Sequence, residues 1–114
     1  MILPCKIKFA DEKVKKAFEE LQYSTTEDKH LFDFLERAFK DIEKNAFCGI
    51  QISKKQIPKE YLKKYGIDNC WKYNLPNAWR LLYSVAREEV TVISIILEWS
   101  KHKEYDRKFN YKKT

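Results

Sequence analysis

Three segments decide the fold: CWKYNL at 70–75, WRLLYSVA at 79–86 and VTVISIILE at 90–98. In the first two, aromatic and aliphatic residues alternate with other residue types at the period of a β-strand. The short stretch 76–78 predicts a turn between them, and the charged pair 87–88 predicts a second turn. The third segment is apolar at successive positions, so it predicts a strand in the interior of a sheet.

Alternation also assigns side chains to the two faces of the first hairpin. If the turn sets Leu75 opposite Trp79, then Asn74 faces Arg80. Lys72 is then the diagonal neighbour of Arg80 on the same face. We expect the aromatic face to be covered by helices. The other face is expected to be concave and basic, with Lys72 and Arg80 near its centre.

The first part of the chain predicts a strand followed by two helices. Residues 6–9 alternate charged and apolar side chains, as a short strand does. Apolar residues then recur at helical spacing, which predicts helices over 11–22 and 26–45. Ser24 and Glu27 predict a capping box at the start of the second helix, with Ser24 as the N-cap.

The middle and the end of the chain predict shorter elements. Residues 47–52 predict a strand, 58–64 predict a short helix that Gly66 ends, and a charged helical segment is expected from about Ser100. With 114 residues the chain predicts a single domain, 1–114. The element order predicts an α+β fold in which a helical hairpin packs on one face of a small, mostly antiparallel, curved sheet.

Charge and composition favour an acidic partner. The formal net charge is +6 and the pI is near 9.2, which suits nucleic acid or an acidic protein. The uncharged, strongly apolar run 90–97 is far shorter than the about 20 residues of a membrane-spanning helix. The N-terminal residues lack the layout of a signal peptide. We therefore expect a cytoplasmic protein with no membrane segment.

The cysteines and histidines predict neither a disulfide framework nor a metal site. Cys5, Cys48 and Cys70 are far apart in sequence, and their odd number argues against full pairing. Two isolated histidines do not complete a metal-ligand set with them. Buried thiols are the expectation for all three cysteines.

The order of these elements, together with the residues of 70–105, resembles the RelE/ParE superfamily of toxin–antitoxin systems. Its best-known members cut messenger RNA on the ribosome. RelE-type toxins carry a phosphate-contacting arginine where this chain has Arg80, in the run Trp-Arg-Leu-Leu-Tyr at 79–83. Lys72 matches the first of two lysines on the preceding strand. The resemblance implies a RelE-like β-α-α-β-β-β fold with a short C-terminal helix.

The resemblance also implies a metal-independent endoribonuclease without a cofactor. Arg80 and Lys72 are its expected transition-state contacts, since a guanidinium stays charged and can hold two phosphate oxygens. His102 or Tyr105 is expected to transfer protons. The expected partners are mRNA, the ribosome and a cognate antitoxin with an acidic or amphipathic segment. Four residues are expected to bind the RNA backbone: Lys54, Lys55, Lys101 and Arg107.

Departures from the pattern leave other readings open. Asn74 stands where the second lysine is expected, and Glu98-Trp99 replaces a basic pair. The alternatives are a ParE-like protein that binds gyrase, a member that binds only an antitoxin, and an RNA-binding module without cleavage. Arg80 could also form a structural ion pair with Glu98 or Glu89. The histidine, tyrosine and lysines named above could be ordinary surface or anchoring residues.

Overall fold

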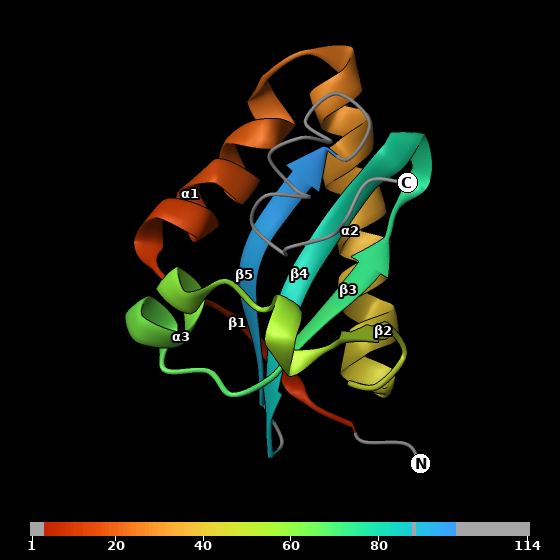
Figure 1. Cartoon of the computed structure of the whole chain (residues 1–114). Helices are drawn as coiled ribbons and strands as arrows, with labels where there is room; N and C mark the ends of the chain where they lie inside the picture. The colour runs from red at the N-terminus through yellow and green to blue at the C-terminus, as the bar shows by residue number, and fades with distance from the viewer. Residues whose placement is uncertain (1–3, 88, 98–114) are drawn as a thin grey trace, which may run out of the picture.

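The computed structural model describes residues 4–87 and 89–97. Over these residues it is an α+β structure built on a five-stranded, mostly antiparallel sheet of order β1-β5-β4-β3-β2 (Figure 1). Among the strands that the structure describes, only β1 and β5 run parallel to each other. The strand bounds are β1 Lys6–Phe9, β2 Ile50–Ile52, β3 Cys70–Asn74, β4 Trp79–Ala86 and β5 Glu89–Leu97. The apolar strand β5 lies between β1 and β4, as its composition predicts.

Helices lie on both sides of this sheet. The helices α1 (Glu12–Glu20) and α2 (Thr26–Lys44) form a hairpin on the side that we call the helical face. The short helix α3 (Lys59–Tyr65) lies on the opposite side, the second face (Figure 1). Among the described residues, each helix is too short or too polar to cross a bilayer. Short 3₁₀ turns complete the path: η1 Leu21–Tyr23, η2 Lys54–Gln56 and η3 Pro76–Ala78.

Side-chain caps start the two long helices. The Asp11 carboxylate accepts a hydrogen bond from the Val14 N–H at 2.9 Å, which begins α1. At α2, the Thr25 hydroxyl accepts from the Asp28 N–H at 3.1 Å. The capping box predicted with Ser24 as N-cap is therefore wrong by one residue. Two adjacent hydroxyl residues precede this helix, and the one with extended backbone at the helix boundary is Thr25.

The main core lies between the helical hairpin and the helical face of the sheet. The predicted stripe of α2 is buried at Leu31, Leu35, Ala38 and Ile42, whereas Phe34 is half-buried. These side chains pack with four buried residues of the sheet: Leu81, Tyr83, Val90 and Val92. This arrangement confirms that the aromatic face of β3 and β4 is the one that the helices cover.

A second, smaller core covers part of the second face. Six residues form it, with Tyr65 and Ile67 at its margin: Ile52, Ile57, Tyr61, Cys70, Leu82 and Ile93. The residues from β2 to α3 thus fold back over the sheet with Ile52, Ile57 and Tyr61 inward and with their lysines outward. The sequence predicted a basic second face and did not predict this apolar core. The predicted strand over 47–52 is also shortened to 50–52.

The strand β5 contributes to both cores and contains a β-bulge. Leu82 pairs with Ser94 and Tyr83 pairs with Val92, so β5 has one extra residue at this point. Val92 belongs to the main core and Ile93 to the second core. Alternation turns these two successive side chains to opposite faces, and the extra residue at the bulge shifts the pairing with β4 by one position.

Candidate functional site

Lys72, Asn74 and Arg80 lie together on the second face, near the turn between β3 and β4. Asn74 pairs with Arg80 and Lys72 pairs with Leu82, so Lys72 and Arg80 are diagonal neighbours on one face. Leu82 belongs to the core on the second face, which places Arg80 on that side as well. The predicted position of Lys72 and Arg80 opposite the two long helices is confirmed.

A three-residue turn, Pro76–Ala78, sets this register. The Leu75 N–H donates to the Trp79 carbonyl at 2.9 Å, which closes the hairpin at the predicted pair. Asn77 and Ala78 have φ values of 62° and 65°, in the left-handed region. Asparagine visits this region readily, whereas alanine pays a steric cost there. With these two residues in the left-handed region, Pro76–Ala78 reverses the chain between β3 and β4.

The side chains of Lys72 and Arg80 are partly shielded from water. Both side chains are half-buried, and the Nε atom of Arg80 is buried. A cation beside low-dielectric protein attracts an anion more strongly than a fully solvated one does. Arg80 also presents a planar guanidinium that can contact two oxygens of one phosphate. The site is chemically suited to an anionic group with several oxygens.

The core on the second face changes the predicted shape of this site. Ile57 and Tyr61 cover the part of the face near Cys70 and Leu82. Lys72 and Arg80 therefore lie beside a covered region of the second face, which the sequence did not predict. Ile57 and Tyr61 lie in a lysine-rich segment, so the sequence did not indicate that they join a core. Lys54 and Lys55 lie in η2, exposed, directly after the strand β2 that borders the face.

The pairing of β4 with β5 excludes an ion pair between Arg80 and Glu89. Glu89 lies opposite Ala86 at the far end of β4, whereas Arg80 lies opposite Ile96. The Glu89 carboxylate pairs instead with the Lys8 ammonium on β1. The ion pair of Arg80 with Glu89 is therefore wrong. Five further expectations lie outside the described residues: Glu98, Lys101, His102, Tyr105 and Arg107.

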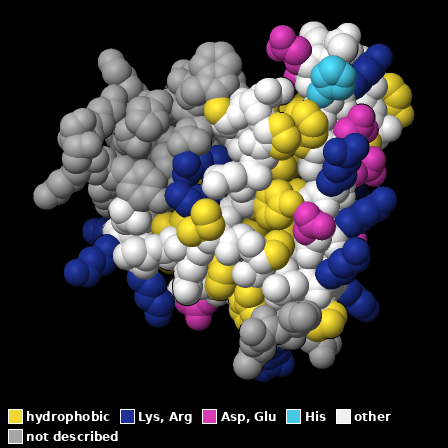
Figure 2. Space-filling model, turned by 90° about the vertical axis from the view of Figure 1, so that its right-hand side faces the viewer, with side chains coloured by type: hydrophobic (Ala, Val, Ile, Leu, Met, Phe, Trp, Pro, Cys, Tyr) yellow, Lys and Arg dark blue, Asp and Glu magenta, His cyan; other side chains and the backbone are white. Residues whose placement is uncertain are grey.

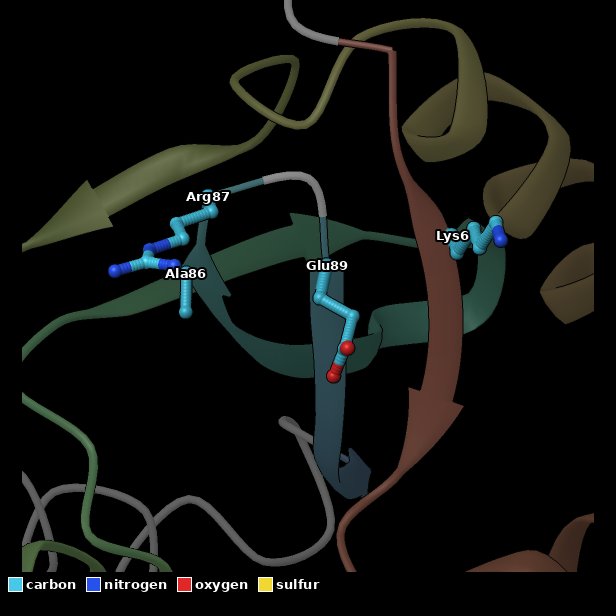
Figure 3. A pocket seen from close by; sticks show the side chains of 4 residues that line it. All are labelled: Lys6, Ala86, Arg87 and Glu89. Atoms are coloured by element: carbon cyan, nitrogen blue, oxygen red, sulfur yellow. The ribbon is translucent and has the colours of Figure 1, made fainter.

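A hollow at the end of the sheet does not have the character of a binding site. It is lined by Lys6 of β1, Ala86 and Arg87 at the end of β4, and Glu89 of β5. All four residues are exposed. In Figure 3 the three charged side chains point in different directions and do not converge on one point. Within the described residues, moreover, no three histidine, cysteine or acidic side chains gather as a metal site would require.

The three thiols occupy different environments. Cys70 is fully buried, and burial raises its pKa to about 12. Cys5 is half-buried, and its Sγ donates to the Ile42 carbonyl at 2.9 Å. Cys48 is exposed, which corrects the prediction of three buried thiols. Desolvation nevertheless raises the pKa of the Cys48 thiol, so this cysteine is not a thiolate nucleophile at neutral pH.

One polar pair beside the site has no signal in the sequence. The Tyr73 hydroxyl donates to the Asp41 carboxylate of α2 at 2.5 Å. Burial, with this hydrogen bond and the Asp41 charge added to it, raises the pKa of Tyr73 to about 12. Tyr73 lies on the helical face of β3, between Lys72 and Asn74, whose side chains turn to the second face. The contact joins residues 32 positions apart, so only the packing of α2 against β3 reveals it.

Comparisons with known proteins add no relative from which a function could be carried over. No family model, curated protein sequence or solved structure matches the chain at a significant level. The residues of the β3–β4 hairpin and the order of the elements are therefore the features that bear on function.

Proposed function

We propose that this chain is a RelE-like toxin that cleaves messenger RNA on the ribosome without a metal or cofactor. The observation that carries the proposal is the register of the β3–β4 hairpin. It sets Arg80 opposite Asn74 and diagonal to Lys72, on the face turned away from α1 and α2. The succession of strand, helical hairpin and meandering strands supports a RelE-like topology within the α+β fold.

The proposed reaction is an internal transesterification. The 2′-hydroxyl oxygen attacks the adjacent phosphorus while the bond from phosphorus to the 5′-oxygen breaks. The products are a 2′,3′-cyclic phosphate and a free 5′-hydroxyl. The 2′-hydroxyl proton passes to a base, and an acid supplies the proton of the leaving oxygen. His102 and Tyr105 are proposed for these proton transfers, on the resemblance alone.

In this scheme, Arg80 binds the non-bridging phosphate oxygens, where negative charge increases in the transition state. Its half-buried position strengthens this interaction. Lys72 supplies a second positive charge across the diagonal. Lys54 and Lys55, exposed in η2, are proposed to contact the RNA backbone and add affinity without reading sequence. Lys101 and Arg107 are proposed for the same role, again on the resemblance alone.

The proposed setting is the cytoplasm, where the toxin meets ribosomes and a cognate antitoxin. The net charge of +6 suits both an RNA target and an acidic antitoxin segment. Antitoxin segments of this kind often fold only on binding. Association is therefore expected to weaken as the salt concentration rises.

A second candidate is a non-catalytic, ParE-like protein that acts by binding another protein. Two observations favour it: Asn74 replaces a cation beside Arg80, and the core on the second face covers part of the sheet next to Lys72. Both reduce the positive, open surface that RNA would use.

Expression without the antitoxin separates these candidates. The nuclease predicts slowed growth and new mRNA ends inside codons by primer extension, and Arg80→Ala is expected to remove both effects. Gyrase-dependent loss of DNA supercoiling without new mRNA ends would replace the nuclease with the ParE-like candidate. Toxicity and mRNA cutting that persist unchanged in Arg80→Ala would remove Arg80 from the mechanism.

A further inference from the structure

The end of β3 that carries Asn74 is paired on one side only, among the strands that the structure describes. The strand β2 pairs with Cys70–Lys72 and ends there, so Tyr73 and Asn74 extend beyond it. On the other side β4 continues, and Asn74 lies opposite Arg80. One edge of the candidate site is thus built on a strand end that lacks a second neighbouring strand.

The direction of this strand end decides how Asn74 and Arg80 face each other. The Leu75 N–H donates to the Trp79 carbonyl at 2.9 Å. Because backbone hydrogen bonds alternate along an antiparallel pair, Asn74 and Arg80 form a pair without such bonds between them. The Cα atoms of such a pair lie about 4.5 Å apart, and their side chains lie close together. A small change in the path of β3 therefore changes the distance between the Asn74 amide and the Arg80 guanidinium.

A contact from α2 holds the same strand end. The Tyr73 hydroxyl donates to the Asp41 carboxylate at 2.5 Å, and the Tyr73 ring packs at the margin of the main core. With a pKa raised to about 12, the hydroxyl remains a donor at neutral pH. Helix α2 passes behind β3 in Figure 1, and Figure 2 shows this side of the molecule, where acidic side chains lie among hydrophobic and basic ones. The strand end is thus tied to the long helix beneath it.

We propose that Tyr73 and Asp41 are positioning residues for the site on the second face. Their hydrogen bond fixes the end of β3 and so holds Lys72 and Asn74 in place beside Arg80. Successive side chains of a strand point to opposite faces, so a ring held on the helical face also sets the direction of its neighbours on the second face. The effect on the strand end is independent of the ribonuclease proposal, whereas the effect on cleavage rests on it.

Backbone ¹⁵N relaxation of the full chain tests the effect on the strand end without any substrate. The order parameter of the Asn74 N–H is expected to be about 0.85 in wild type, as in rigid backbone, and to fall toward about 0.6 in Tyr73→Phe and Asp41→Ala. Asp41→Asn keeps an oxygen that can accept from the Tyr73 hydroxyl, so it should retain the wild-type value. The Leu35 N–H of α2 should stay unchanged in all three variants.

This measurement separates positioning from a general loss of stability. At a temperature where every variant is folded, lower overall stability leaves the order parameters of the folded state unchanged. The proposal is overturned if Asn74 is equally rigid in wild type and the variants, or if it is already flexible in wild type. It is also overturned if Asp41→Asn resembles Asp41→Ala, or if Leu35 loses order together with Asn74.

The consequence for the reaction is measured as cleavage of ribosome-bound mRNA over a range of substrate concentrations. Tyr73→Phe and Asp41→Ala are each expected to lower the rate constant at saturation about ten-fold, because the groups that contact the phosphate are misplaced. The half-saturating concentration should change less than two-fold. The double variant should be no slower than either single one, since both remove the same hydrogen bond.

The matched control is Asp33→Ala. Asp33 is an exposed carboxylate of the same helix that forms no ion pair with another described residue, so this variant should cut at the wild-type rate. Wild-type rates in Tyr73→Phe and Asp41→Ala would overturn the positioning role in the reaction. If wild type does not cut, the ribonuclease proposal fails, and the order parameter of Asn74 still decides whether Tyr73 and Asp41 fix the end of β3.

Discussion

The hydroxyl of Tyr83 connects the sheet to the loop that follows α2. It accepts a hydrogen bond from the Gly49 N–H at 3.0 Å and donates one to the Ala46 carbonyl at 2.9 Å. A Cβ atom at Gly49 would lie 2.5 Å from the Tyr83 hydroxyl oxygen and 2.6 Å from the Lys72 carbonyl oxygen. Glycine at this position therefore allows the loop to approach the two strands that carry Lys72 and Arg80.

Replacing Tyr83 with phenylalanine should destabilise the fold. Tyr83 is fully buried, and the change removes the partner of the buried Ala46 carbonyl. The expected loss in the free energy of unfolding is about 1–3 kcal/mol, measured by urea denaturation. Tyr23→Phe is the control, because Tyr23 is 85% exposed and should change stability by less than about 0.5 kcal/mol. Equal stability of the two variants would show that the Tyr83 hydrogen bonds contribute nothing net.

The contact between Tyr73 and Asp41 should be lost at alkaline pH. The pKa of Tyr73 is raised from 10.0 to about 12, so the folded state favours the protonated hydroxyl. Its stabilising effect is complete below pH 10 and is lost as the pH rises through about 12. The stability difference between wild type and Tyr73→Phe should therefore be constant below pH 10 and shrink above it.

Ultraviolet titration of the tyrosine hydroxyls tests whether the Asp41 carboxylate contributes to the raised pKa of Tyr73. Asp41→Asn removes the carboxylate charge, so the Tyr73 titration should move down toward pH 10. Tyr73→Phe identifies which step in the titration belongs to this residue. If Asp41→Asn leaves the step near pH 12, the Asp41 carboxylate does not contribute to the shift.

The rate of thiol labelling should be lower for the more deeply buried cysteines. With iodoacetamide at pH 8, the exposed Cys48 is expected to react first and the half-buried Cys5 more slowly. Cys70 should react only when the protein unfolds, since it is buried and its pKa is raised to about 12. Mass spectrometry of peptides gives the three rates. Labelling of Cys70 as fast as Cys48 in folded protein would show that the core on the second face opens readily.

The β3–β4 hairpin was predictable because two local signals agree. Strand alternation assigns faces, and the short turn at 76–78 suits a register in which Asn74 lies opposite Arg80, as the structure has it. The interior position of β5 was predictable for a similar reason, since only a central strand buries apolar side chains on both faces. The stripe of α2 likewise follows from helical periodicity.

The core on the second face was not predictable from local patterns. Ile52 lies in β2, Ile57 follows η2 and Tyr61 lies in α3. They share no period, and several lysines lie between them. Their burial depends on how the segment folds back across Cys70 and Leu82. Asn69 is a similar case: its side chain continues the ladder by accepting from the Val85 N–H at 2.8 Å and donating to the Val85 carbonyl at 2.7 Å.

For the candidate site, the placement of Lys72 and Arg80 on one face followed from alternation alone. The shape of their surroundings did not, because it depends on contacts between segments far apart in the chain. The pairing of Tyr73 with Asp41 also requires the packing of α2 on the sheet. Sequence periodicity predicts which face of a helix is buried, but not which residues of the sheet that face contacts.

The most direct test of the ribonuclease proposal is the cleavage rate of ribosome-bound mRNA by the purified chain, measured for wild type, Arg80→Ala and Arg87→Ala. Arg87 is the matched control, an exposed arginine in the turn at the far end of β4. Arg80→Ala should cut about a hundred- to a thousand-fold more slowly, through loss of one transition-state contact. Arg87→Ala should cut at the wild-type rate. Cleavage by Arg80→Ala as fast as wild type, or no cleavage by wild type, would contradict the account.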